Sequence, residues 1–214
     1  MEKKGYIQTY TGLSKGKTTS AFGLALRAMA YNWKIFVIQF MKGDPKFDYG
    51  EIRSCERFKD LIKVYQVRLE AKKIIKMLQG DKDAFEECKR KTIRGFNYFL
   101  NELKRNKYDM VILDEILPSL DNYLIPIELF KSFIDNRDKT MEIVLTGRMK
   151  RLELISYITT ISDYFSKLKA VKHPFEKKCP KCGKIFRNEE SYFEGCPYCV
   201  VKLVKVTARK AIEY

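Results

Sequence analysis

The segment that decides the fold reads Thr11-Gly12-Leu13-Ser14-Lys15-Gly16-Lys17-Thr18-Thr19. A strand-like run, Tyr6–Tyr10, precedes it, and a helical pattern of alanines and leucines follows. Glycines in such a turn allow backbone N–H groups and the helix N-terminus to surround an anion, while the next lysine and hydroxyl can bind phosphate and Mg²⁺. Three residues separate Gly12 from Gly16, one fewer than in the usual Walker A motif. The segment therefore predicts a nucleotide-phosphate loop.

An acidic pair farther along the chain supports this prediction. Asp109–Leu113 is typical of a buried strand, with four apolar residues after its first position, and Asp114 and Glu115 follow it directly. P-loop proteins place a metal-side carboxylate at such a strand end, and two acids left there without a role would be costly. We therefore predict that Lys17 reaches phosphate oxygens, that Thr18 and Asp114 hold Mg²⁺, and that Glu115 faces the nucleotide.

Apolar runs rich in β-branched and aromatic residues recur along the chain, with helical patterns between them. The expected strands are Tyr6–Tyr10, Lys34–Phe40, Ile62–Val67, Asp109–Leu113, Glu142–Thr146 and Tyr164–Val171. The longest helix is expected around residues 85–103, where apolar residues recur every three or four positions. This alternation predicts an α/β fold of the P-loop (RecA-like) type, with a mostly parallel sheet covered by helices on both faces.

Four cysteines near the C-terminal end form two C-x₂-C pairs: Cys179, Cys182, Cys196 and Cys199. Each pair can place two thiolates on two corners of a tetrahedron, so we predict structural zinc in a small zinc-ribbon-like insertion, with an iron centre or redox cysteines as the alternatives. The predicted division is a nucleotide-binding domain over 1–175, a zinc module over 176–200 and a returning segment over 201–214. Cys55 and Cys88 lack ligand spacing and are expected to be buried thiols.

The composition limits the possible functions. The 214 residues are 45% hydrophobic and 32% charged, with a net charge of +15 and a single histidine, His173, which excludes multi-histidine metal sites. The basic excess would suit a polyanion, but basic and aromatic residues do not interleave as in a stacking platform, so we do not expect nucleic acid. No signal peptide or membrane span is visible, and we expect a cytoplasmic protein.

Six blocks occur in an order that resembles the ATP:corrinoid adenosyltransferases, a P-loop family that makes adenosylcobalamin from ATP and a reduced corrinoid. The blocks are Gly12–Gly23, Gln39–Gly43, Leu113–Glu115, Thr146–Arg148, Val171–Phe175 and Ala208–Tyr214. The sequence departs from this family at residues 67–70, where the family has an aromatic motif on the corrin side, and at the cysteine insertion.

The resemblance implies a chemistry that needs no general base, because a Co(I) corrinoid is itself a strong nucleophile toward the 5′ carbon of ATP. Loop residues 11–19, Lys17 and Mg²⁺ would stabilise the departing triphosphate, and Lys15 would add charge. By the same resemblance, Arg27, Glu115 and Arg148 are candidates for contacts with ATP. It also implies a homodimer and an electron donor as partner.

Two other functions stay open at this point. A nucleoside kinase of the thymidine kinase type also joins a P-loop domain to a zinc-bearing appendage. A zinc-ribbon, nucleic-acid-dependent ATPase would share the same loop and predicts salt-sensitive polynucleotide binding. The phosphate product of ATP distinguishes both from the transferase.

Overall fold

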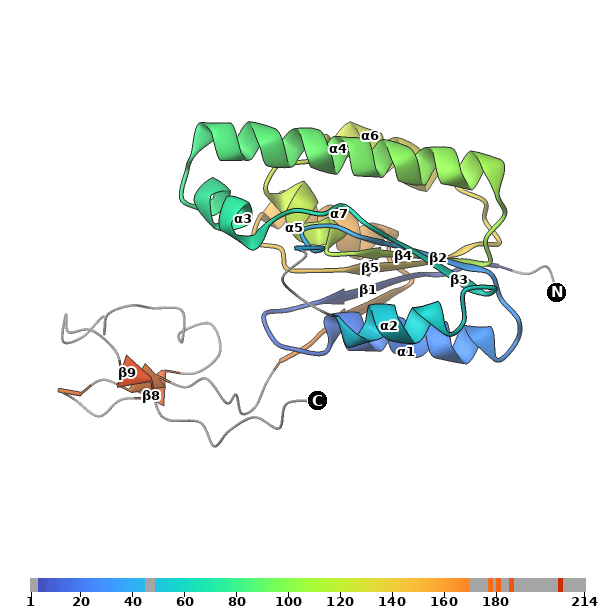
Figure 1. Cartoon of the computed structure of the whole chain (residues 1–214), viewed down its shortest axis with the longest axis horizontal. Helices are drawn as coiled ribbons and strands as arrows, with labels where there is room; N and C mark the ends of the chain where they lie inside the picture. The colour runs from blue at the N-terminus through green and yellow to red at the C-terminus, as the bar shows by residue number, and fades with distance from the viewer. Residues whose placement is uncertain are drawn as a thin grey trace. The chain divides into compact units, whose positions relative to one another are not determined.

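The main unit of the computed structural model is a parallel sheet with helices on both faces (Figure 1). The structure describes residues 4–44, 49–169, 177–178, 180–181, 185–186 and 204–205. The six strands of the main sheet are β1 (Ile7–Thr11), β2 (Ile35–Gln39), β3 (Ile62–Gln66), β4 (Met110–Asp114), β5 (Glu142–Thr146) and β6 (Tyr164–Lys167). They pair in the order β3-β2-β4-β5-β1-β6, and every pairing is parallel. The predicted α/β class is confirmed.

Seven helices are described in the same unit. They are α1 (Lys17–Met29), α2 (Gly50–Glu56), α3 (Ala71–Leu78), α4 (Lys82–Arg105), α5 (Ile116–Asp121), α6 (Ile127–Asp135) and α7 (Leu152–Ile161). In Figure 1, α1 and α2 cover one face of the sheet and the others cover the opposite face. The predicted long helix is confirmed as α4, whose Asp81 side chain caps its N-terminus by accepting a 2.9 Å hydrogen bond from the Ala84 N–H.

The two faces of the sheet follow from the alternation of side chains along each strand. In β2, Ile35 and Val37 belong to the core cluster beneath α1, while Phe36 and Ile38 belong to the larger cluster beneath α4. All five β2 residues are buried, as expected for a parallel strand with helices on both faces.

The last predicted strand was too long. The sequence suggested Tyr164–Val171, but β6 ends at Lys167, and residues 168 and 169 are not in a strand. The physical reason is the length of the neighbouring strand β1. Lys167 pairs with Thr11, the last residue of β1, so β1 offers no partner for residue 168. Residues 170 and 171 lie outside the described part of the chain.

A second unit contains β7 (Lys177–Lys178), β8 (Ile185–Phe186) and β9 (Val204–Lys205), which form an antiparallel sheet in the order β8-β7-β9. The four cysteines of the predicted zinc module and His173 lie outside the described residues. Among the residues described, no helix has the length and apolar composition needed to cross a membrane.

At the C-terminal end of α4, Glu102 collects three hydrogen bonds. Its carboxylate accepts from Lys63 Nζ at 2.8 Å, Asn106 Nδ2 at 2.8 Å and the Tyr108 hydroxyl at 2.6 Å. Burial opposes the charged form, but the bond from Lys63 and the others outweigh it and lower the pKa of Glu102. The charged carboxylate therefore joins α4 to β3.

We expect Glu102→Gln to lower the free energy of unfolding by about 1–3 kcal/mol at pH 7, since a charge-accepting group with three donors is lost. Because the folded pKa lies below the unfolded value of about 4.3, this stabilisation is complete above that value and is lost as pH falls through the folded pKa. Urea unfolding between pH 7 and pH 3 measures the difference, with the exposed Glu86 on the same helix as the Glu→Gln control. Equal losses in both variants would contradict the role given to Glu102.

Candidate functional site

The glycine loop joins the end of β1 to the start of α1, as the sequence predicted. Gly12 and Gly16 both have φ of +109°, a left-handed conformation that glycine adopts without strain. Gly16 is the residue before the helix, no side chain caps that end, and the first turn contains no acidic residue. No carboxylate from this turn therefore competes with a bound anion for the N-terminal N–H groups of α1 or for the positive end of the helix dipole.

The loop side chains divide into buried and exposed groups. Lys17 is only 6% exposed, and Thr11, Gly12 and Ser14 are also buried. Lys15 and Thr19 are exposed. Of the two loop lysines, Lys17 is thus the one whose charge acts in a water-poor environment.

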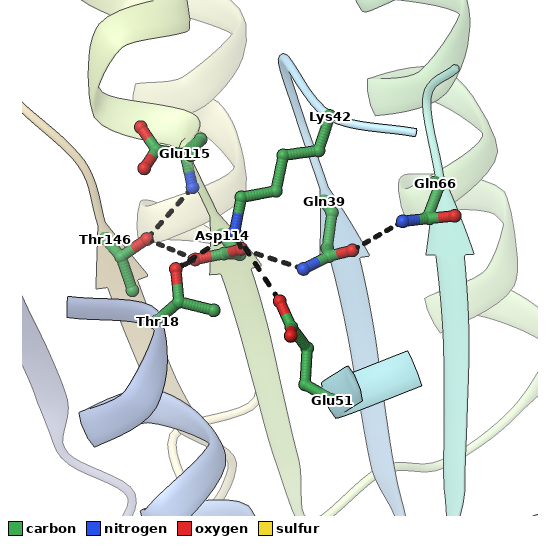
Figure 2. Close-up of polar contacts among 8 residues, drawn as sticks. All are labelled: Thr18, Gln39, Lys42, Glu51, Gln66, Asp114, Glu115 and Thr146. Atoms are coloured by element: carbon green, nitrogen blue, oxygen red, sulfur yellow. Dashed lines mark hydrogen bonds and ion pairs between the residues drawn. The ribbon is translucent and has the colours of Figure 1, made fainter. Parts of the chain in front are cut away.

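The carboxylate of Asp114 is the centre of the polar cluster drawn in Figure 2. It is fully buried at the end of β4. Its Oδ1 accepts from Thr18 Oγ1 at 3.0 Å and Thr146 Oγ1 at 2.6 Å, while its Oδ2 accepts from Gln39 Nε2 at 3.0 Å and Lys42 Nζ at 2.7 Å. Four donors compensate the cost of burying this charge. The structure therefore brings together Thr18 and Asp114, the residues predicted for Mg²⁺.

Three of the four donors to Asp114 were not among the predicted site residues: Gln39, Lys42 and Thr146. Each follows from the order of the strands, because the carboxyl ends of β2, β4 and β5 lie side by side and Gln39 pairs in register with Asp114. Gln39 is itself held by Gln66 of β3, whose Nε2 donates to its Oε1 at 2.8 Å. Polar residues at the ends of neighbouring apolar strands were the available signal.

Glu115 lies beside Asp114 but has a different setting. Its backbone is left-handed, with φ of +57°, and its N–H donates to Thr146 Oγ1 at 2.9 Å. Burial and then the charge of Asp114 raise the pKa of Glu115 above its ordinary value, against the attraction of Lys42, Lys17 and Arg148. These mutual effects place Glu115 within one group of charges at the sheet edge.

The pKa of the Lys17 ammonium is lowered by burial, despite the attraction of Glu115, and the charge of Arg148 acts in the same direction. Burial alone would also lower the pKa of Lys42, but the carboxylate of Asp114 outweighs it, and that pKa lies above its ordinary value. Arg148, predicted from the resemblance, therefore shares the electrostatic neighbourhood of the loop.

Arg27 lies elsewhere. It is exposed in the last turn of α1, and at 1.5 Å per residue the ten positions from Lys17 put it about 15 Å from the loop. It lines a hollow with Tyr6, Tyr31 and Trp33 at the opposite end of the helix. Within this chain the structure does not bring Arg27 to the other predicted site residues.

Cysteine and metal predictions have different outcomes. Cys55 and Cys88 are buried as predicted, and burial raises the pKa of Cys55 to about 11, so this thiol is inert at neutral pH. In the part of the chain that the structure describes, no three His, Cys, Asp or Glu side chains gather as a metal-binding group. The predicted zinc ligands Cys179, Cys182, Cys196 and Cys199 are outside that part.

Comparison with known proteins finds relatives that match most of the chain. Residues 3–184 match the family model described as ATP:corrinoid adenosyltransferase BtuR/CobO/CobP. The corrinoid adenosyltransferase of Escherichia coli K12 is 28% identical over 178 residues, which cover 82% of each chain, and the CobA enzyme of Salmonella typhimurium is 28% identical over 177 residues, with the same coverage. A corrinoid adenosyltransferase from Sinorhizobium is 29% identical over 181 residues, which cover 81% of this chain and 76% of the relative. The chain belongs to the ATP:corrinoid adenosyltransferase family.

Proposed function

We propose that this chain transfers the 5′-deoxyadenosyl group of ATP to the Co(I) centre of a reduced corrinoid and releases intact triphosphate. Family membership and the names of the relatives support the reaction. The observation that carries it to particular residues is the glycine loop with its buried Lys17, next to the buried Asp114. A nucleoside kinase or a nucleic-acid-dependent ATPase is no longer favoured, because the matching family model and the named relatives are adenosyltransferases.

The reaction balances without an acid or a base. The cobalt electron pair forms the bond to the 5′ carbon, the bond from that carbon to the ester oxygen breaks, and its electron pair leaves with triphosphate. The main difficulty is the negative charge that develops on the leaving oxygen. In our proposal the backbone of residues 11–19 and the Lys17 ammonium stabilise that charge, which is the work a preorganised, buried cation does best.

The residues present suit Mg²⁺. Hydroxyl and carboxylate oxygens are the ligands this ion prefers, and it commonly takes only one or two from protein when phosphates and waters supply the rest. In the structure a cation already lies between the two groups, since Lys42 Nζ is 3.0 Å from Thr18 Oγ1 and 2.7 Å from Asp114 Oδ2. We propose that Thr18 and Asp114 hold Mg²⁺, whose charge would further stabilise the triphosphate.

Contacts with the rest of ATP are assigned by the same proposal to Glu115 and Arg148, which share the electrostatic neighbourhood of Lys17. A contact between Arg27 and ATP is supported only by the family resemblance, because Arg27 lies at the end of α1 away from the glycine loop. A homodimer and an electron donor that supplies Co(I) belong to the proposal on the same ground. The cytoplasmic location predicted from the sequence is also part of the proposal.

Product analysis tests the function. The protein is incubated with ATP, Mg²⁺ and a chemically reduced corrinoid without oxygen, in the dark, and the phosphate products are separated. We expect triphosphate and a light-sensitive corrinoid spectrum. Because residues 67–70 replace the family's aromatic motif, complete and incomplete corrinoids should be compared. ADP in place of triphosphate with every corrinoid would refute the proposal.

We also propose that the four cysteines hold one structural zinc ion within residues 176–200. Two C-x₂-C pairs with thirteen residues between them support it. The purified protein should contain about one zinc per chain, and Cys179→Ser with Cys182→Ser should lose the metal, because each removes a thiolate of a closed site. Elemental analysis of both proteins is the measurement, and Cys55→Ser is the control. Full zinc retention in the double variant would rule out this ligand set.

A further inference from the structure

The proposed reaction gives no role to Lys42, although its ammonium contacts both residues proposed to hold Mg²⁺. Its ammonium donates to Thr18 Oγ1 at 3.0 Å and to Asp114 Oδ2 at 2.7 Å, while the Thr18 hydroxyl donates to Asp114 Oδ1 at 3.0 Å. The same two residues are those proposed to hold Mg²⁺. The singly charged Lys42 ammonium thus contacts the same Thr18 hydroxyl and Asp114 carboxylate that would bind the doubly charged Mg²⁺ (Figure 2).

The backbone on both sides of Lys42 fixes the position of this residue. Met41, before it, has φ of +50°, and Gly43, after it, has φ of +90°. A Cβ on Gly43 would lie 3.0 Å from the Cβ of Gln66 and 3.1 Å from the Cα of Arg68, so the segment approaches the end of β3 closely. The Lys42 carbonyl accepts a 3.2 Å hydrogen bond from the Leu69 N–H. A strained and pinned backbone of this kind persists only where its surroundings fix it.

The Lys42 ammonium has a second acidic neighbour besides Asp114, and an aromatic ring lies near it as well. Glu51 Oε1 of α2 lies 4.0 Å from Lys42 Nζ, and the ring centroid of Tyr49 lies 5.9 Å from it. The Lys42 side chain is 16% exposed and that of Glu51 is 27% exposed, so the region between them is only partly screened by water. A short movement of the ammonium toward Glu51 would leave Asp114 without breaking the backbone contacts of Lys42.

A divalent cation between Thr18 and Asp114 would lie close to the Lys42 ammonium, which is 2.7 Å from Asp114 Oδ2, and the repulsion between the two cations is large where water is scarce. We propose that Lys42 is a positioning residue that occupies the magnesium position between Thr18 and Asp114 until the nucleotide arrives. Mg²⁺ then enters only together with the triphosphate group of ATP. That group supplies oxygen ligands for the ion and the negative charge that offsets the displaced ammonium. This inference rests on the proposed function, since it concerns the same metal and phosphate site.

Manganese binding to the nucleotide-free protein tests it. Mn²⁺ is titrated into the full chain, and the free ion is followed by electron paramagnetic resonance. We expect weak binding by the wild type, and Lys42→Met should lower the Kd by tenfold or more because the competing cation is gone. Lys42→Gln, which keeps a hydrogen-bond donor but no charge, should behave alike and provides a second variant if the first folds poorly.

Two controls locate the effect. Lys63→Met removes the lysine of the Glu102 ion pair, outside the site, and should leave Mn²⁺ binding at the wild-type level. Adding Asp114→Asn to Lys42→Met should abolish the gain. If neither Lys42 variant binds Mn²⁺ more tightly than the wild type, the ammonium does not hold the metal position and the inference fails. No ATP or corrinoid is present, so this outcome is separate from any failure of the transferase reaction.

Discussion

Replacing Lys17 with alanine is expected to slow the release of triphosphate by about 10²- to 10³-fold, the size typical of removing one preorganised charge from a transition state. Lys17 is 6% exposed at the first position of α1, so its charge acts where water cannot screen it. The fold should persist, because alanine is the best helix former and the side chain lies at a helix end. Single-turnover kinetics measures the rate, and circular dichroism checks the fold.

The exposed Lys15 in the same loop is the matched control. Its charge is screened by water, and Lys15→Ala is expected to reduce the rate by less than about tenfold. Thr18→Ala and Asp114→Ala should raise the Mg²⁺ concentration needed for half-maximal rate. Near-normal turnover in Lys17→Ala, with a folded protein, would mean that the glycine loop is structural.

The second large effect is on stability. Gly147→Ala is expected to lower the free energy of unfolding by about 3–5 kcal/mol, from overpacking together with backbone strain. Gly147 has φ of +134°, and a Cβ there would lie 2.2 Å from Cδ of Pro118 and 3.1 Å from Cβ of Leu117 in α5. Because Gly147 follows Thr146, the change would also disturb the hydroxyl that holds Asp114. Chemical denaturation gives the value.

Gly80 separates the two contributions. It also has a positive φ, +92°, but nothing lies within 4 Å of a Cβ placed there. Gly80→Ala should therefore cost only the strain of a left-handed backbone, about 1–2 kcal/mol. Equal losses at both positions would show that close packing against α5 contributes nothing.

Much of the fold could be predicted because its signals are local. The apolar run Lys34–Phe40 predicted a buried strand, and alternation along that strand puts Phe36 and Ile38 on one face of the sheet and Ile35 and Val37 on the other. The end of β6 could not be predicted in this way. It depends on where β1 ends, and Thr11 and Lys167 are far apart in the sequence.

The site shows the same division between local and non-local information. The glycine loop and the strand-end acid were identified from short motifs, and the structure brings Thr18 within 3.0 Å of Asp114. Gln39 and Lys42 were recognised only as part of a sequence block, because their contact with Asp114 arises from β2 pairing with β4. Pairing order is a property of the assembled sheet, and no residue near Lys42 in the sequence indicates it.

The bond that breaks in ATP tests the proposed chemistry most directly. ATP labelled with ¹³C at the 5′ carbon is mixed with the protein, Mg²⁺ and a chemically reduced corrinoid in the dark, and ¹³C and ³¹P spectra are recorded on the same sample. The predicted result is one labelled carbon bonded to cobalt for each intact triphosphate released. A label that stays bonded to oxygen in ADP, with phosphate released or passed to another acceptor, would contradict adenosyl transfer by this site.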